Sequence, residues 1–303
     1  PRPLHLDPIE KKTFFPFLPS AEAFSLATAG CNLRCLYCQN WSISQNPPEK
    51  TYNIDLPPQQ VVQQALASQA PIIAYTYSEP IVFFEYVVNT AHLAREAGLK
   101  NVVVSAGFIN PEPLRELCQA VDAIKIDLKG YDENFYRQVC QGELQPVLRT
   151  IQVIHEMGIH LEIVNLVVPT LNDSLEQLRN LARWLARELS PDIPLHFTRF
   201  FPMYKLTNLP PTPVETLTHA REIAMEEGMR FVYVGNVPGH PGSNTYCPSC
   251  GRLLIERQGF IVQSYHLQEG KCPYCGQPIP GIWWPKEPPN VGRVPAPFGR
   301  TDH

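Results

Sequence analysis

Short apolar segments alternate regularly with amphipathic segments along most of this chain. The apolar segments predict strands at residues 72–77, 101–106, 123–128, 161–168, 195–201 and 231–234. The segments between them predict helices at 58–68, 81–97, 111–120, 144–157, 174–188 and 214–227. Strands and helices in this order form parallel sheets with right-handed crossovers. The predicted fold class is therefore α/β, either a partial or complete parallel (β/α) barrel or an open doubly wound sheet, with its site at the carboxyl ends of the strands.

Three cysteines follow a further apolar segment, residues 24–30, that ends in a glycine. Cys31, Cys35 and Cys38 have the spacing Cys-x3-Cys-x2-Cys. They supply three thiolates where a cubane iron–sulfur cluster usually takes four, which leaves one iron open for a ligand that is not protein. Zinc prefers four ligands and usually takes paired Cys-x2-Cys knuckles, so it fits this spacing poorly. The sequence favours a [4Fe-4S] cluster over zinc or ordinary buried cysteines.

A second set of cysteines lies near the end of the chain in two Cys-Pro-x-Cys-Gly knuckles, formed by Cys247, Cys250, Cys272 and Cys275. Four thiolates at these spacings predict a tetrahedral zinc ribbon, with a four-cysteine iron–sulfur cluster as the alternative. The residues between the knuckles predict a hairpin that turns at Gln258 and Gly259. The expected role is to stabilise a small lobe, and recognition of a macromolecule is the second possibility. Of the two remaining cysteines, Cys118 is expected in the core and Cys140 has no assigned role.

Charged residues interrupt the predicted strand at 123–128, where a parallel strand should be almost continuously apolar. Lys125, Asp127 and Lys129 share one face of this strand by its period of two. In a barrel that face points inward, where charges need partners or ligands. The two interpretations are a functional site and an internal salt bridge that ties strands together.

Other polar residues lie near predicted strand ends. Glu79 precedes a proline suited to the first turn of the next helix, and Ser105 ends its strand as a hydrogen-bond donor. A capping box of Asp173 and Glu176 is expected to begin the helix at 174–188. The residues offered as a hypothetical substrate pocket are His196, Arg199 and Tyr204.

The cysteine motif at residues 31–38 resembles the signature of the radical S-adenosylmethionine (SAM) enzymes, in which SAM chelates the open iron through its amino and carboxylate groups. Over nearly its whole length the chain resembles the AmmeMemoRadiSam-system radical SAM enzymes, relatives of pyruvate formate-lyase activase. The motifs that carry the resemblance are residues 4–12, 30–35, 77–80 and 234–239 and the two terminal knuckles. In this chain Tyr77 and Ser78 stand where two glycines are usual, and Met203–Lys205 stand where the activases carry a histidine.

This resemblance implies a barrel of the radical SAM type with a small C-terminal zinc-ribbon lobe. It implies a [4Fe-4S] cluster, SAM and Zn²⁺ as cofactors. The SAM contacts that it implies are Tyr37, whose ring would flank adenine, together with Asn40, Ser78, Glu79, Ser105, Asp127 and Lys129. The implied domains are an N-terminal extension at 1–22, the barrel at 23–240, the zinc-ribbon-like module at 241–284 and a Pro-rich tail at 285–303. The resemblance also suggests that the N-terminus is truncated.

The expected activity is reductive cleavage of SAM to a 5′-deoxyadenosyl radical that abstracts hydrogen from a protein or peptide substrate, with activation of a glycyl radical enzyme as its specific form. Modification of a small molecule or RNA by the same radical is the alternative. A rival of another class is an electron-transfer or recognition protein that does not turn over SAM. The implied partners are a reducing donor such as flavodoxin or ferredoxin and AMMECR-like and Memo-like proteins.

Composition sets the cellular context that we expect. Nine cysteines with no secretory signal at the start of the sequence predict a reducing compartment and a cytoplasmic location. No apolar run reaches about 18 residues, so no membrane segment is expected. The 25 basic and 29 acidic residues give a net charge of −4, so a nucleic-acid partner is not indicated.

Overall fold

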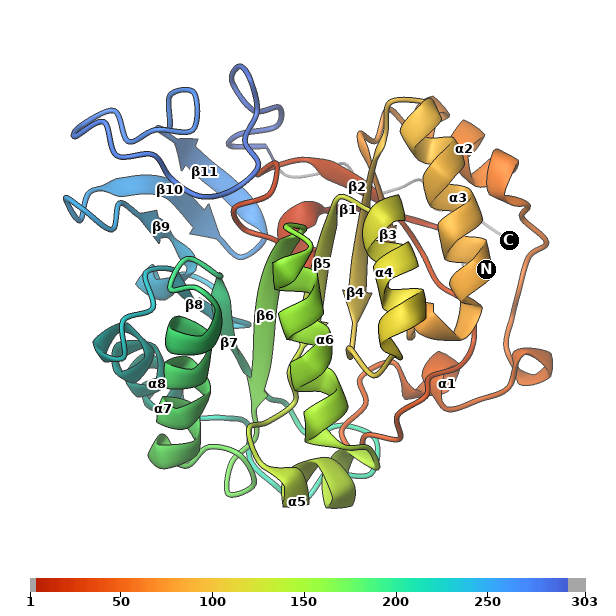
Figure 1. The fold of residues 1–303 in the computed structure, drawn as a ribbon, viewed down its shortest axis with the longest axis horizontal. Coiled ribbons are helices and arrows are strands. Elements are labelled where there is room, and N and C mark those ends of the chain that lie inside the picture. The colour runs from red at the N-terminus through yellow and green to blue at the C-terminus, as the bar shows by residue number, and fades with distance from the viewer. Residues whose placement is uncertain (1–3, 294–303) are drawn as a thin grey trace.

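The centre of the molecule is a sheet of eight strands that pair in the order in which the chain makes them (Figure 1). The computed structural model describes residues 4–293. The strands are β1 (His5–Pro8), β2 (Glu22–Leu26), β3 (Ile72–Tyr75), β4 (Lys100–Ser105), β5 (Ala123–Asp127), β6 (His160–Val167), β7 (Leu195–Arg199) and β8 (Val232–Gly235). Strands β2 to β8 are parallel, and β1 is antiparallel to β2. The α/β class and all six predicted strands are confirmed, and the apolar segment before the three cysteines forms β2, whereas β1 was not predicted.

The sheet curls into a partial barrel. The backbone N–H of Phe15, between β1 and β2, donates to the Glu162 carboxylate on β6 at 3.0 and 3.1 Å. The Phe15 ring also lies 4.8 Å, centroid to centroid, from both His196 on β7 and Tyr233 on β8. The start of the chain therefore crosses the inner face of the last three strands. Among the described residues no ladder joins β1 to β8, so a seam remains between these two edges.

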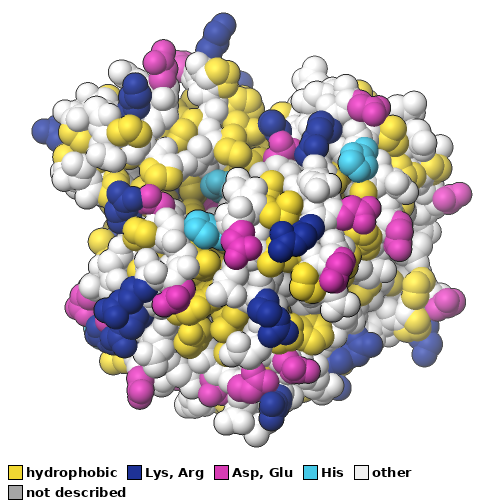
Figure 2. Space-filling model, in the orientation of Figure 1, with side chains coloured by type: hydrophobic (Ala, Val, Ile, Leu, Met, Phe, Trp, Pro, Cys, Tyr) yellow, Lys and Arg dark blue, Asp and Glu magenta, His cyan; other side chains and the backbone are white. Residues whose placement is uncertain are grey.

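Six long helices cover the outer face of the sheet (Figure 1). They are α2 (Pro58–Ala67), α3 (Phe84–Glu96), α4 (Pro111–Ala120), α6 (Leu144–Glu156), α7 (Leu175–Trp184) and α8 (Val214–Glu226). All six predicted helices are thus confirmed. Charged side chains of both signs are interspersed over the face of the molecule in Figure 2. No helix within residues 4–293 is long and apolar enough to span a membrane.

The beginning of α7 differs from the prediction by one residue. The hydroxyl of Ser174 accepts the backbone N–H of Gln177 at 3.2 Å and is the N-cap. The Asp173 carboxylate instead accepts the N–H of Thr170 at 2.9 Å, in the preceding loop. The predicted capping box is therefore wrong, because Asp173 stabilises the turn before the helix. The last part of the predicted helix is not α-helical but forms a π-helical turn, η5 (Leu185–Leu189), directly after α7.

A three-stranded sheet forms a C-terminal lobe at the end of the molecule opposite α1 (Trp41–Ser44) and α5 (Glu133–Phe135) (Figure 1). Its strands are β9 (Thr245–Tyr246), β10 (Leu253–Gln258) and β11 (Ile261–Tyr265). Gln258 pairs with Ile261, so the hairpin turns at Gly259 and Phe260, one residue later than predicted. The Trp284 ring N–H then donates to the Pro19 carbonyl at 2.8 Å. The structure does not describe residues 1–3 or residues 294–303. The second range is the last part of the expected Pro-rich tail at 285–303.

Candidate active site and metal centre

A cavity of about 470 Å³ opens at the carboxyl ends of the barrel strands. The cysteines of the Cys-x3-Cys-x2-Cys motif and polar residues from five strand ends line it together. These residues are Cys31, Cys35, Cys38, Glu79, Ser105, Asp127, Lys129, Thr198 and Asn236. The structure thus brings together predicted cluster ligands and predicted SAM contacts that lie up to about 100 residues apart in the sequence. They meet because the carboxyl ends of parallel strands lie at one end of a barrel.

The loop that carries the three cysteines is held by backbone hydrogen bonds. The N–H groups of Arg34 and Leu36 donate to the carbonyls of Cys140 and Val139, each at 2.9 Å. The Cys38 N–H closes a turn onto the Cys35 carbonyl at 3.2 Å, and the Leu33 N–H lies 3.4 Å from the Cys31 sulfur. These bonds hold the loop from which the three cysteines line the cavity.

The donor set fits an iron–sulfur cluster chemically. Burial raises the pKa of the Cys31 thiol to about 12. A thiolate at this position therefore needs a positive charge beside it, and cluster iron supplies one. The hydroxyl of Ser44 lies 3.0 Å from the Cys38 sulfur, within hydrogen-bond distance, and also donates to the Asn40 carbonyl at 3.0 Å.

Cys140 lies beside the cluster loop, which the sequence did not indicate. Its contact with the Cys35 thiol raises the pKa of Cys35 and lowers that of Cys140. The Tyr37 hydroxyl lies 3.7 Å from the Cys140 sulfur, and the Tyr37 ring stacks on Phe135 at 6.3 Å. Tyr37, expected beside adenine, is thus buried in the floor of the cavity. A single cysteine about 100 residues from the motif carries no spacing signal, so its position became visible only in the fold.

The turn after β3 has the backbone geometry that glycine usually provides. Tyr77 has a φ of +68°, in the left-handed region that side chains other than glycine rarely adopt. Its carbonyl accepts the Asn40 side-chain N–H at 2.8 Å, and its hydroxyl bonds to Asp7 on β1. The Lys12 ammonium lies 4.1 Å from the centre of its ring. These contacts hold a tyrosine where the family pattern has glycine.

Glu79 connects two strand ends. Its buried carboxylate accepts the Ser105 hydroxyl at 2.7 Å, the Ala106 N–H at 2.8 Å and the Ile81 N–H at 3.3 Å. Burial raises the pKa of Glu79, and these hydrogen bonds act against that effect. Two predicted SAM contacts, Glu79 and Ser105, therefore bond to each other. The neighbouring Ser78 hydroxyl is buried and has no hydrogen-bond partner among the described residues.

The charges of β5 face the cavity, as the period-two pattern predicted. The Asp127 carboxylate bonds to the ammonium of Lys125 and, at 3.1 Å, to that of Lys129. Burial alone would raise the pKa of Asp127, but the two lysines outweigh it and hold the pKa at about 2. Asp127 is therefore ionised at neutral pH. The side chains of Lys125, Asp127 and Lys129 all line the cavity. The same three residues can therefore form an internal salt bridge and also contact a ligand.

The structure does not bring the hypothetical substrate-pocket residues to this cavity. His196 is fully buried deeper in the barrel, 2.7 Å from the Glu162 carboxylate. Arg199 points away and donates to the Thr212 carbonyl at 2.8 Å. Tyr204 stacks on Trp41 at 5.3 Å. Thr198, which alternates with Arg199 along β7, reaches the cavity instead.

The four C-terminal cysteines come together as predicted, with their sulfur atoms all within 4.8 Å of one another. Cys247 and Cys275 are 3.6 Å apart, and Cys250 and Cys272 are 3.7 Å apart. Gly251, at a φ of +72°, donates its N–H back to the Cys247 carbonyl at 2.9 Å and closes the first knuckle. This geometry fits a closed four-thiolate metal site.

Comparison with known proteins gives the family. A model described as the radical SAM superfamily matches residues 25–185. An uncharacterized protein of Methanocaldococcus jannaschii is 48% identical over 278 residues, which are 91% of this chain and 83% of that protein. A pyruvate formate-lyase-activating enzyme of Clostridium pasteurianum is 22% identical over 162 residues, 50% of this chain and 65% of that enzyme.

A solved structure supports the fold. SuiB of Streptococcus suis bound to S-adenosylmethionine superposes with a TM-score of 0.56 at 12% identity, over 75% of this chain and 53% of that one. The family match extends from β2 to the end of α7 and so includes the cysteine loop and three of the five strand ends that line the cavity, those of β3, β4 and β5. By sequence, fold and cysteine site, this chain belongs to the radical SAM superfamily.

Proposed function

We propose that this protein binds a [4Fe-4S] cluster through Cys31, Cys35 and Cys38 and cleaves SAM there to a 5′-deoxyadenosyl radical that abstracts hydrogen from a protein or peptide substrate. Membership of the superfamily implies the cluster and SAM. The observation that carries the proposal is that the three thiols open into the same cavity as the polar ends of β3, β4 and β5.

The residues around the cavity have separate roles in this proposal. The backbone carbonyls of the turn at Tyr77 and Ser78 bind the SAM amino group, and Asn40 and Glu79 hold that turn in place. Asp127 and Lys129 contact the polar parts of SAM. The apolar side chains between them exclude water from the reacting atoms, as a radical reaction requires. They are Val104, Ala106, Val164 and Leu166.

The proposed substrate is a protein or peptide. The activating enzyme of Clostridium pasteurianum supports hydrogen abstraction from a protein, with activation of a glycyl radical enzyme as its specific form. A reducing partner such as flavodoxin or ferredoxin would supply the electron. AMMECR-like and Memo-like proteins remain predicted partners. We assign zinc to the C-terminal site because four converging thiols match its preferred tetrahedral coordination.

The first experiment tests SAM cleavage. Protein reconstituted anaerobically and reduced with dithionite should contain about four irons at the first site and release 5′-deoxyadenosine from SAM. Cys35→Ala should lower this release by roughly two orders of magnitude because it removes one of three ligands. Cys118→Ala is the matched control, since Cys118 is buried in α4 away from the cavity. Bound iron with sound folding but no 5′-deoxyadenosine would instead support an electron carrier.

The second experiment tests the substrate class. The dialysed macromolecular fraction of the producing organism should stimulate formation of 5′-deoxyadenosine, and protease treatment of that fraction should abolish the stimulation. Loss of stimulation after nuclease treatment would identify RNA instead. Stimulation by the small-molecule fraction alone would contradict the proposed protein or peptide substrate.

A further inference from the structure

The seam between β1 and β8 is the side of the barrel that the sheet leaves open. Residues from both edges of this seam line the cavity. Lys12 and Thr13 follow β1, and Asn236 follows β8. A substrate cavity that must exclude water therefore needs another part of the molecule at this side.

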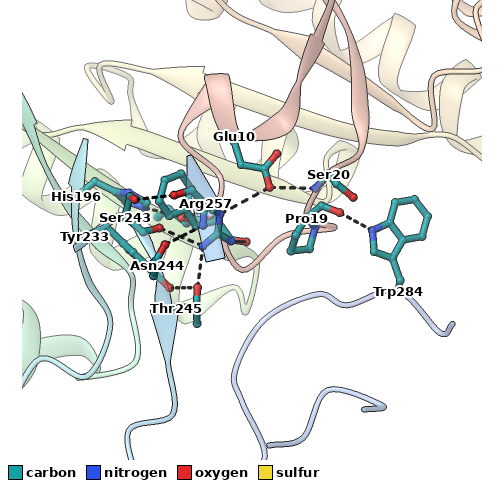
Figure 3. A network of polar contacts seen from close by, with 12 residues as sticks. Glu10, Pro19, Ser20, His196, Tyr233, Ser243, Asn244, Thr245, Arg257 and Trp284 are labelled. Carbon is teal, nitrogen blue, oxygen red and sulfur yellow. Dashed lines mark hydrogen bonds and ion pairs between the residues drawn. The ribbon is translucent and has the colours of Figure 1, made fainter. Parts of the chain in front are cut away.

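The C-terminal lobe is attached to both edges of the seam (Figure 3). Arg257, on β10 and only 3% exposed, donates to the Phe15 carbonyl at 3.1 Å and lies 3.8 Å from the Glu10 carboxylate. Its guanidinium also donates to the Thr245 hydroxyl at 2.9 Å, and that hydroxyl lies 3.1 Å from the Tyr233 hydroxyl on β8. The β10–β11 hairpin is thus fixed between the beginning and the end of the barrel.

The tip of this hairpin reaches the cavity. Phe260, three residues after Arg257, lines the same cavity as the three cluster cysteines, Asp127 and Lys129. Its side chain is 44% exposed, so it is not required for the core of the lobe. Gly259, at a φ of +61°, makes the tight turn that presents it. The ring therefore adds an apolar surface to a cavity that is also lined by the charged side chains of Lys12, Asp127 and Lys129.

We propose that the C-terminal lobe is part of the active site, because Phe260 forms the wall of the cavity at the seam between β1 and β8 and limits the access of small solutes from that side. The ring also supplies the apolar surface on which a side chain of the substrate packs. Phe260 is therefore a specificity-determining residue, and the lobe positions it. This inference rests on the proposed cleavage of SAM.

The test uses a small hydrogen donor in place of the unknown substrate. Reduced holoenzyme is incubated with SAM and fully deuterated 2-propanol, and the fraction of 5′-deoxyadenosine that carries deuterium is measured by mass spectrometry. Phe260→Ala should raise this fraction several-fold, because removal of the ring opens the seam to the alcohol. Phe260→Trp should keep it at or below the wild-type value. Gln263→Ala, an exposed change on β11 of the same hairpin, is the control and should leave it unchanged.

Each outcome has a distinct meaning. Equal deuterium fractions in the wild type and Phe260→Ala, with the metal content and fold of both intact, would overturn the inference. A rise in Gln263→Ala as large as that in Phe260→Ala would also overturn it, because general loosening of the hairpin would then explain both. Failure of every variant, including the wild type, to release 5′-deoxyadenosine would refute the proposed function itself.

Discussion

At the scale of single residues, the site depends on side chains that organise the backbone around it. Glu79 is the clearest example, because it follows β3 and its carboxylate accepts two hydrogen bonds from the end of β4. Tyr77 is another, since its side-chain contacts stabilise a left-handed backbone conformation that costs roughly 1 kcal/mol or more. Both residues belong to the motif at 77–80 that carries the family resemblance, and their bonds to Ser105 and Asp7 appear only in the structure.

We predict that Glu79→Gln destabilises the fold and weakens SAM binding. An amide has only one acceptor oxygen for the three donors that now meet the carboxylate, so at least one buried group loses its partner. The expected loss is about 1–3 kcal/mol in the free energy of unfolding, measured by urea titration, together with a higher Kd for SAM. Glu85→Gln, an exposed change in α3, is the control. Unchanged stability and SAM affinity in Glu79→Gln would contradict this account of the turn.

At the scale of secondary-structure elements, the helices and parallel strands follow from local periodicity, whereas β1 does not. It is only four residues long and ends in a proline, so it shows no clear alternation. Its place is fixed by pairing with β2 and by Asp7, which bonds to Lys12 at 2.7 Å and to Tyr77 after β3. A single acidic side chain thus connects the first strand to the turn at Tyr77 and Ser78.

We predict that Asp7→Asn lowers stability at neutral pH but not in acid. Burial alone would raise the pKa of Asp7, but Lys12, Lys11 and the Tyr77 hydroxyl lower it from 3.8 to about 2. A carboxyl group with a lowered pKa stabilises the folded state above its unfolded pKa, and that stability is lost as the pH falls from about 4 to 2. The expected difference is about 1 kcal/mol at neutral pH after allowance for solvent screening.

Urea titrations of the wild type and Asp7→Asn at decreasing pH check this prediction. The difference in the free energy of unfolding between the two proteins should shrink below about pH 4. Asp55→Asn, an exposed change between η2 (Pro48–Lys50) and α2, should show no such dependence. A difference that stays constant with pH would mean that charge is not the source of the effect.

At the scale of the whole molecule, the lobe and one edge of the barrel share a hydrophobic cluster, which is separate from the main core of the barrel. The metal-site cysteines Cys247 and Cys272 pack in the same cluster as Phe15, Phe231 and Tyr233 of the barrel. The family resemblance implied that residues 241–284 form a separate zinc-ribbon-like module. The packing instead makes the lobe a structural partner of the barrel.

We predict that removal of the metal from the lobe destabilises the barrel as well. Cys272→Ser should lose the C-terminal metal and several kcal/mol of stability, because coordination is coupled to folding. The loss should appear as a lower midpoint of one shared unfolding transition, followed by near-UV circular dichroism. Ser249→Ala, an exposed change inside the first knuckle, is the control. A separate transition for the lobe, with the barrel unaffected, would show that the two fold independently.

Much of the site could be predicted because its signals are local. The spacing of Cys31, Cys35 and Cys38, the two terminal knuckles and the charged face of β5 all lie within short stretches of sequence. The residues of the hypothetical substrate pocket lacked such a signal. His196 and Arg199 were considered from residue type and strand position alone, and the fold pairs them with Glu162 and the Thr212 carbonyl away from the cavity.

The sequence by itself determined the α/β class, the parallel direction of the strands and the grouping of seven cysteines into two sets, because periodicity and ligand spacing act over a few residues. Only the tertiary structure decided where Cys140, Phe260 and Arg257 lie. Arg257 contacts Phe15 across 242 residues, and Cys140 meets Tyr37 across 103. Contacts of this kind arise when the sheet curls and the lobe docks on it. No local pattern encodes them, because their geometry depends on the packing of the whole chain.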